Sequence, residues 1–310
     1  MGEETLIYAT VENAAGIRSL HLWQSGSSSQ RFDYVGPVLE AVGDEGQVGM
    51  THVAYDRDDA DAPFKMWYST RYSARATAIA YATSYDGKAW DRKGMVYSPT
   101  LPSEAAGLTV DFVCRDKSGD WRLFYSGLES VDCIRAMAAT SRKPSGPFVS
   151  PRVIMAPDAA EYAGGAEVTN DDLSLTLTGT PMPAPGFPYV LTDGTQSGSG
   201  LVFIERVAGN IAYLRNPAGL TAEGYRLLSV HARKVSPSYY CQSRSGGRGY
   251  FTGFGAISGV TIEYVFAVEE RDGRFYPIAD DEVFRPTSSV DQFSFENPVP
   301  ISSSADCPPC

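Results

Sequence analysis

FKMWYSTRYSARATAIAYATSYDGKAW, residues 64–90, holds the pattern that decides the fold. Apolar and polar side chains alternate in its first part, as in a half-buried strand, and Asp86-Gly87 is a tight-turn dipeptide. Together with its flanks, the stretch predicts four short antiparallel strands. The expected strands are Gly49–Asp56, Phe64–Thr70, Thr77–Ser84 and Trp90–Tyr97.

The same unit occurs a second time along the chain. Trp67-Tyr68-Ser69 recurs as Phe124-Tyr125-Ser126, and Ala82-Thr83-Ser84 recurs as Ala139-Thr140-Ser141, each time 57 positions later. Several matches at one offset indicate one supersecondary unit used twice. The strands expected in the second copy are Leu108–Cys114, Trp121–Gly127, Ile134–Thr140 and Phe148–Met155.

Repeated four-stranded antiparallel units are typical of propeller blades. Looser strand patterns give an N-terminal blade of three strands, a degenerate blade over 166–214 and a last blade over 236–276. A propeller must close its ring, because open blades leave unpaired edges, and Val290–Pro298 could supply the missing strand. We therefore predict an all-β, five-bladed β-propeller, with one domain over residues 1–300 and a tail over 301–310.

Composition limits the partners. Hydrophobic residues make up 43% of the chain, enough for a packed core, and the net charge is -11. That charge repels phosphate backbones and anionic lipids, so we expect neither nucleic acid nor a membrane as partner. The start, MGEETLIYAT, lacks the basic and apolar regions of a signal peptide, which predicts a cytoplasmic protein unless a leader has been removed.

The repeated segment also resembles a known group of proteins. The stretch FKMWYST…TAIAYATSYDGKAWDRKG and its copy WRLFYSG…IRAMAATSRKPSGPF resemble blades of the five-bladed propeller glycoside hydrolases. That superfamily includes the invertase and levansucrase group, the arabinanase and xylosidase group and the mannoside phosphorylases. The resemblance is strongest over Gly49–Met155. It implies a central cleft lined by the innermost strand of each blade.

The resemblance also implies where carboxylates belong. A glycosidase needs an acid and a nucleophile or base, and a third carboxylate commonly tunes the acid. In the relatives these are two Asp and then a Glu, on the innermost strands of three successive blades. Asp111, within the apolar run Leu108–Val113, and Glu167, after Gly164-Gly165, match the last two. The alternatives are an Asp at a strand edge and a solvated turn Glu.

The first carboxylate of that set is missing. The corresponding stretch, Val48–Val53, holds His52 instead, which either acts as a base near neutral pH or hydrogen-bonds within the core. An imidazole in place of a nucleophilic carboxylate suits proton transfer, isomerisation or cyclisation better than glycosyl transfer.

Other clusters have two interpretations each. Tyr239 and Tyr240 either stack on a sugar or pack in the core. The acidic residues of 56–61 lack the pattern of an EF-hand loop and are expected to be a solvated turn rather than a calcium site. The basic residues of 231–234 suit either inorganic phosphate or plain surface charge. Cys307 and Cys310 form an isolated C-P-P-C, expected to be a non-functional tail. We expect no metal and no cofactor.

The sequence thus predicts a glycoside hydrolase-like enzyme acting on a small-molecule or oligosaccharide substrate that is carbohydrate-like or polyhydroxylated. We expect Glu167 as the acid, Asp111 as a tuning carboxylate or base, and His52 as a base or orienting group. Two alternatives stay open: a non-hydrolytic biosynthetic propeller enzyme of the cyclase, isomerase or lyase type, and an inactive glycan-binding propeller.

Overall fold

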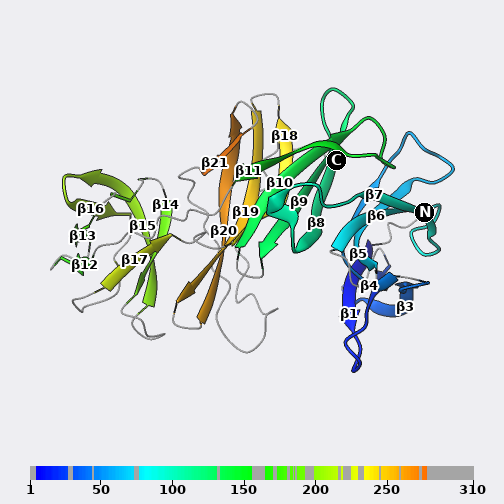
Figure 1. The fold of residues 1–310 in the computed structure, drawn as a ribbon, viewed down its shortest axis with the longest axis horizontal. Helices are drawn as coiled ribbons and strands as arrows, with labels where there is room; N and C mark the ends of the chain where they lie inside the picture. Colours follow the sequence, from blue (N-terminus) through cyan, green and yellow to red (C-terminus); the bar gives the residue numbers. More distant parts are fainter. Residues whose placement is uncertain are drawn as a thin grey trace. The chain divides into compact units, whose positions relative to one another are not determined.

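The computed structural model consists of antiparallel strands and turns, with one short 3₁₀ helix, η1 (Pro102–Glu104), in the part of the chain that it describes (Figure 1). It describes residues 5–26, 31–43, 45–72, 77–130, 133–155, 165–169, 173–179, 182–183, 185, 187–192, 199–215, 218, 225–229, 234–243, 246–257, 260–271 and 274–277. The chain divides into two units, one of residues 1–131 and 136–153 and the other of 132–135 and 154–310. Each unit is described by itself.

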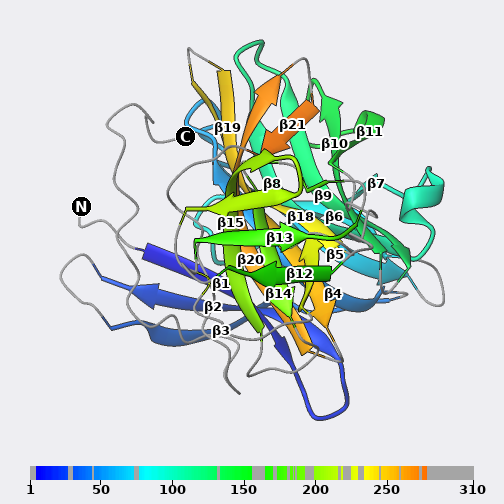
Figure 2. The same ribbon diagram turned by 90° about the vertical axis from the view of Figure 1, so that its left-hand side faces the viewer.

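The first unit begins with two antiparallel sheets. The three-stranded sheet has the order β1 (Thr5–Glu12), β2 (Arg18–Ser25), β3 (Asp33–Leu39), and its strands lie side by side in Figure 2. The four-stranded sheet has the order β4 (Glu45–Tyr55), β5 (Phe64–Tyr72), β6 (Thr77–Ser84), β7 (Asp91–Tyr97). The four strands predicted over residues 49–97 are therefore confirmed.

The second copy of the repeat has the same order. The strands β8 (Gly107–Arg115), β9 (Trp121–Ser130), β10 (Cys133–Ser141) and β11 (Val149–Met155) pair in sequence. Alternation along β5 and β9 puts large apolar side chains on the faces between neighbouring sheets. The resulting core contains Trp67, Tyr81, Leu108, Trp121, Tyr125 and Met137.

Hydrogen bonds hold β8 against the preceding sheet. The Val110 N–H donates to the Ser69 hydroxyl at 2.9 Å. The Thr77 hydroxyl accepts from the Leu108 N–H and donates to the Leu108 carbonyl, both at 2.7 Å. Since side chains of β5 and β6 bind the backbone of β8, the position of β8 is fixed by its neighbour as well as by its own sheet.

The second unit contains a sheet that the sequence did not predict. Over residues 165–229, six strands form a closed sheet, because β17 pairs with both β12 and β14. The predicted four-stranded degenerate blade over 166–214 is therefore wrong. Closure leaves no strand edge unpaired, and it encloses a core that includes Ala166, Leu175, Leu191, Ile204 and Leu227. In ring order the strands are β12 (Gly165–Val168), β13 (Ser174–Leu177), β16 (Ile211–Leu214), β15 (Ser199–Ala208), β14 (Phe187–Thr192) and β17 (Tyr225–Ser229).

Four further strands of this unit pair antiparallel, in the order β18 (Lys234–Ser243), β19 (Gly246–Ile257), β20 (Val260–Arg271), β21 (Arg274–Pro277). They confirm the four strands predicted for the last blade. Val290–Pro298, the segment expected to close the ring, lies outside the described residues, as does the tail at 301–310. Five blades and their closure stay a prediction.

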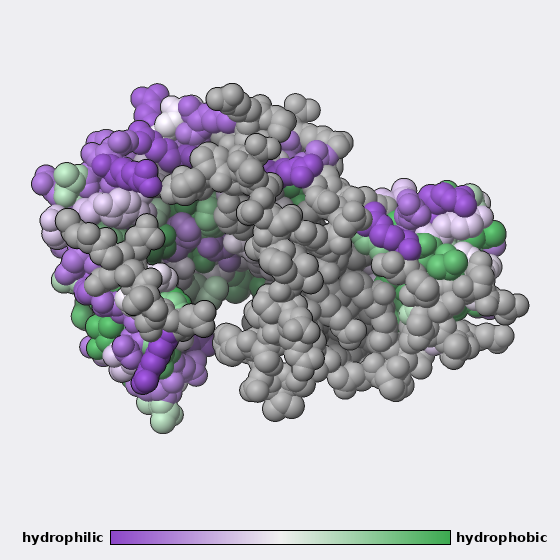
Figure 3. Space-filling model, turned by 180° about the vertical axis from the view of Figure 1, so that it is seen from behind, coloured by the Kyte–Doolittle hydropathy of each residue, from purple (hydrophilic) through white to green (hydrophobic). Residues whose placement is uncertain are grey.

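Hydrophilic side chains cover much of the described surface of the first unit in Figure 3. In the described part of the chain, no helix has the length and apolar character needed to cross a membrane.

Candidate active site

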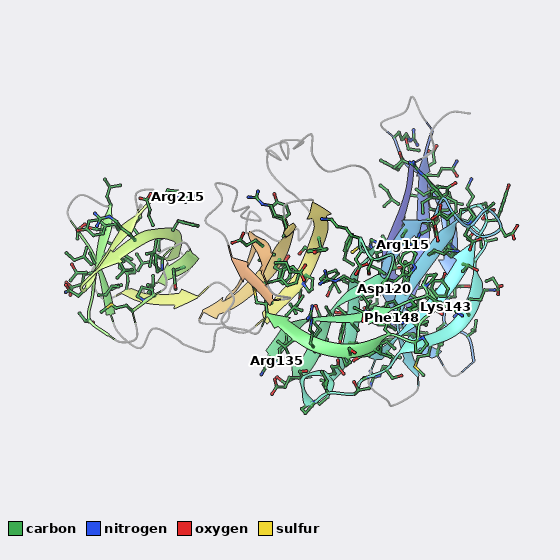
Figure 4. The ribbon with its side chains drawn as sticks, turned by 90° about the horizontal axis from the view of Figure 1, so that it is seen from above. Arg115, Asp120, Arg135, Lys143, Phe148 and Arg215 are labelled. Carbon is green, nitrogen blue, oxygen red and sulfur yellow. The ribbon has the colours of Figure 1, made fainter. Side chains whose placement is uncertain are left out.

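Asp111 occupies a bulge in β8. In the pairing of β8 with β9, Val110 lies opposite Tyr125 and Phe112 lies opposite Phe124, so Asp111 is the extra residue. A bulge bends a strand and re-aims the side chain that it carries. Arg115 and Asp120, labelled in Figure 4, mark the turn that joins β8 to β9.

The environment of Asp111 favours its protonated form. Burial raises the pKa of this carboxyl well above its ordinary 3.8. The Ser126 hydroxyl donates a 2.7 Å hydrogen bond to Asp111 Oδ2, which opposes the rise. Because burial is the larger cause, Asp111 is placed to hold a proton at a pH where an exposed Asp has lost it.

His52 lies on β4 and reaches the same region. Its ring meets the Phe112 ring edge-on, with centroids 4.6 Å apart, and Trp67 lies 6.3 Å away. Burial lowers the pKa of His52 to about 4, although a hydrogen bond with the Val113 backbone raises it. His52 is therefore a neutral imidazole near pH 7, packed against the residue that follows Asp111.

A pocket of about 550 Å³ opens beside His52. It lies between β1, β4, the start of β5 and the turn after β6, and its volume falls within the range of small-molecule sites. Its polar and aromatic lining comes from Thr5, Tyr8, Thr51, His52, Tyr55, Phe64 and Asp86. The Tyr8 hydroxyl donates to the Gly87 carbonyl at 2.5 Å, and burial raises the pKa of that phenol, so it stays protonated.

Glu167 belongs to the second unit. It lies on β12 opposite Thr176 of β13, and its side chain is exposed. Asp111 and His52 thus share a unit and lie on strands that pack together, whereas Glu167 lies in the other unit. Its part in a shared site with them stays a prediction.

The tyrosine pair lies on β18. Tyr240 is 1% exposed, packs edge-on against Phe275 with ring centroids 5.5 Å apart, and donates a hydrogen bond to Glu270. These contacts fit the alternative in which Tyr240 packs in the core and does not stack on a sugar. Tyr239 pairs with Tyr250 across the sheet.

The acidic turn forms ion pairs. Lys65, a buried lysine, binds Asp59, and Arg115 binds Asp58 at 3.0 Å. These contacts fit the predicted turn, and among the described residues no group of three His, Cys, Asp or Glu side chains is placed to hold a metal ion. His231, Arg233 and the C-P-P-C segment lie outside the described residues.

The sequence did not predict the buried carboxyl group of Glu104. Glu104 of η1 is fully buried and accepts hydrogen bonds from Tyr97 at 2.8 Å, from Tyr125 at 2.5 Å and from two backbone N–H groups. These donors replace water around the carboxyl group, so Glu104 holds the 100–104 loop against β9. A Glu within PSEAAG gave no sequence signal, because its partner Tyr125 lies on another strand and only folding brings the two together.

Comparison with known proteins finds similarity to solved structures but no match in sequence. No protein family model matches the sequence, and no curated protein sequence matches it either. Solved structures that this chain resembles include glycoside hydrolases and a glycoside phosphorylase.

Three of these structures show the degree of similarity. An exo-β-1,3-galactanase from Clostridium thermocellum shares 12% identity at a TM-score of 0.39, covering 94% of this chain and 64% of that one. A thermostable family-43 glycoside hydrolase shares 12% identity at a TM-score of 0.38, and the match covers 93% of this chain and 97% of that one. The β-1,2-mannobiose phosphorylase from Listeria innocua, in complex with β-1,2-mannobiose, shares 12% identity at a TM-score of 0.38, and the match covers 83% of this chain and 79% of that one. The chain thus spans less than two thirds of the galactanase.

Proposed function

We propose that the first unit carries the acid–base centre of an enzyme acting on a carbohydrate-like or otherwise polyhydroxylated small molecule. One observation carries the proposal: burial displaces the pKa values of Asp111 and His52 in opposite directions, and both groups lie on adjoining strands. In enzymes, two titratable groups whose pKa values are shifted in opposite directions commonly act as an acid and a base.

The roles follow from the protonation states. A protonated Asp111 gives its proton to a leaving oxygen, and a neutral His52 takes one from a water or a substrate hydroxyl. Asp111 thus takes the role of acid that the sequence assigned to Glu167. Glu167 is kept in the proposal as a second carboxylate.

A second candidate is a non-hydrolytic reaction, such as an isomerisation or cyclisation. It is favoured by His52, because β4 carries an imidazole where glycosyl transfer calls for a carboxylate. Proton abstraction from carbon or oxygen needs only a base of this kind.

Turnover by matched variants tests the proposal. The wild type, Asp111→Asn, His52→Gln and Glu167→Gln are assayed on 4-nitrophenyl glycosides and on unlabelled oligosaccharides, with and without inorganic phosphate. A freed reducing sugar supports hydrolysis, a sugar phosphate supports phosphorolysis, and a rearranged product supports the second candidate. If Asp111→Asn and His52→Gln both keep full turnover on a substrate of the wild type, the assignment is wrong.

A further inference from the structure

The charges around the pocket beside His52 are one-sided. Among the described residues that line it, Asp86 is the only acid, and no Lys or Arg is present. His52 is neutral near pH 7 because burial lowers its pKa to about 4, and Tyr8 is a protonated phenol. The described part of the lining therefore carries one negative charge and no positive charge.

Asp86 keeps its charge because its turn stabilises it. The Ser84 hydroxyl and the N–H groups of Lys88 and Ala89 all donate to Asp86 Oδ1, at 2.8–3.0 Å. These bonds lower the pKa of Asp86. Since they all end on Oδ1, the second oxygen, Oδ2, is left for a ligand.

Aromatic rings complete the wall. Tyr55 and Phe64 lie edge to face with ring centroids 5.1 Å apart, and Tyr8 lies on the neighbouring strand β1. The face of an aromatic ring attracts cations, and a carboxylate beside such rings adds a charge-assisted hydrogen bond.

From this lining we propose that the pocket selects a small organic cation, namely an amino sugar or another polyhydroxylated amine. The ammonium group binds Asp86 and the rings of Tyr55 and Phe64, while hydroxyl groups meet Thr51 and His52. The same carboxylate disfavours sugar phosphates and uronic acids. This inference deepens the proposed function and rests on it, because the pocket is lined by His52, the base of the proposed acid–base centre.

Binding of matched sugars tests the inference. Glucosamine, galactosamine and mannosamine are each compared with the neutral parent sugar by calorimetric titration at pH 6.5. We expect at least one amine to bind about fivefold to tenfold more tightly than its parent, and the preference to shrink in 0.5 M NaCl. No saturable binding of any amine, or equal affinity for every pair, overturns the inference.

Two variants and one control assign the effect to residues. Asp86→Asn keeps the Oδ1 acceptor for the turn and removes the charge, so the amine preference should vanish. Tyr55→Leu removes an exposed ring and should reduce the preference a few-fold. Asp116→Asn is the control, because Asp116 Oδ1 also accepts from a turn, through Ser118 and Asp120, and Asp116 does not line the pocket. An unchanged preference in Asp86→Asn overturns the inference.

The two proposals fail in different ways. If a neutral glycoside is turned over with dependence on His52 but no amine is preferred, the ligand class is wrong and the acid–base centre stands. If amines are preferred through Asp86 but Asp111→Asn and His52→Gln both keep full turnover, the acid–base centre is wrong.

Discussion

The Ser126 hydroxyl on β9 donates a 2.7 Å hydrogen bond to the Asp111 carboxyl in the bulge of β8. This hydrogen bond favours the charged form of the Asp111 carboxyl, whereas burial favours its neutral form. Ser126 therefore makes it easier for Asp111 to give up its proton than burial alone would allow.

Asp111→Asn should reduce turnover about 10²–10⁴-fold, the usual contribution of a general acid. The same change should stabilise the fold at neutral pH. A raised folded-state pKa means that wild-type stability falls as pH rises above about 3.8 towards that pKa, and Asn does not ionise. Urea unfolding at pH 7 and kcat measure the two effects. A less stable Asp111→Asn would show that the carboxylate is charged and satisfied in the folded state.

Acid should destabilise the protein through His52. Between pH 6.5 and about 4, the unfolded chain takes up a proton at His52 that the folded chain does not, so stability falls as pH falls through this window. The slope from this one group is at most about 1.4 kcal/mol per pH unit. His52→Phe copies Phe112, which holds the same register position in the second repeat, and should flatten the dependence in urea titrations between pH 7 and 4. An identical slope in both proteins contradicts the burial of His52.

Gly87→Ala should destabilise the first unit by about 2–4 kcal/mol. Gly87 has a φ of +72°, and a Cβ there would lie 2.7 Å from Leu6 Cδ1 and 2.8 Å from the Tyr8 hydroxyl. Gly43 is the matched control, because its φ is +58° and a Cβ there meets no atom within 4 Å, so Gly43→Ala has only the backbone strain. Thermal unfolding compares the two. Equal losses would mean that β1 does not pack on the turn at Gly87.

Glu104→Gln should cost about 2–4 kcal/mol, since each carboxylate oxygen accepts from two donors and the amide replaces one of these acceptors with an NH₂ donor. The control is Glu12→Gln. Glu12 pairs with Arg18 at a half-exposed site, where an ion pair contributes about 0–1 kcal/mol. Chemical denaturation of both variants checks the difference. A loss at Glu104 no larger than at Glu12 would mean that the carboxylate is reached by water.

Local sequence patterns predicted the sheets of the first unit well. The alternation in Phe64–Thr70 and its copy predicted both second strands, although the structure buries both faces of these strands and not one. The closed six-stranded sheet was missed because β17, which closes it, comes from Tyr225–Ser229, a stretch with no clear alternation.

The candidate site was only partly predictable. Asp111 stood out as a carboxylate within an apolar run, and His52 stood out as the histidine in the stretch where the resembling family has its first Asp. The pocket did not, because its wall joins Tyr8, His52 and Asp86, which only the packing of separate strands brings together. The sequence around Asp86 predicts an ordinary turn residue, and Asp86 does accept the turn hydrogen bonds from the N–H groups of Lys88 and Ala89.

The two repeats place their bulges one pair apart. In β4 one of the two extra residues is Met50, between the partners of Ser69 and Tyr68, whereas in β8 the extra residue is Asp111, between the partners of Tyr125 and Phe124. Met50 has a φ of +36° and is 51% exposed, while Asp111 is half-buried and burial raises the pKa of its carboxyl. Moving the bulge by one residue pair along a duplicated strand thus changes which side chain the bulge presents, while the order of strands in the sheet stays the same. Copies of an ancestral module can diverge in this way while their scaffolding stays alike.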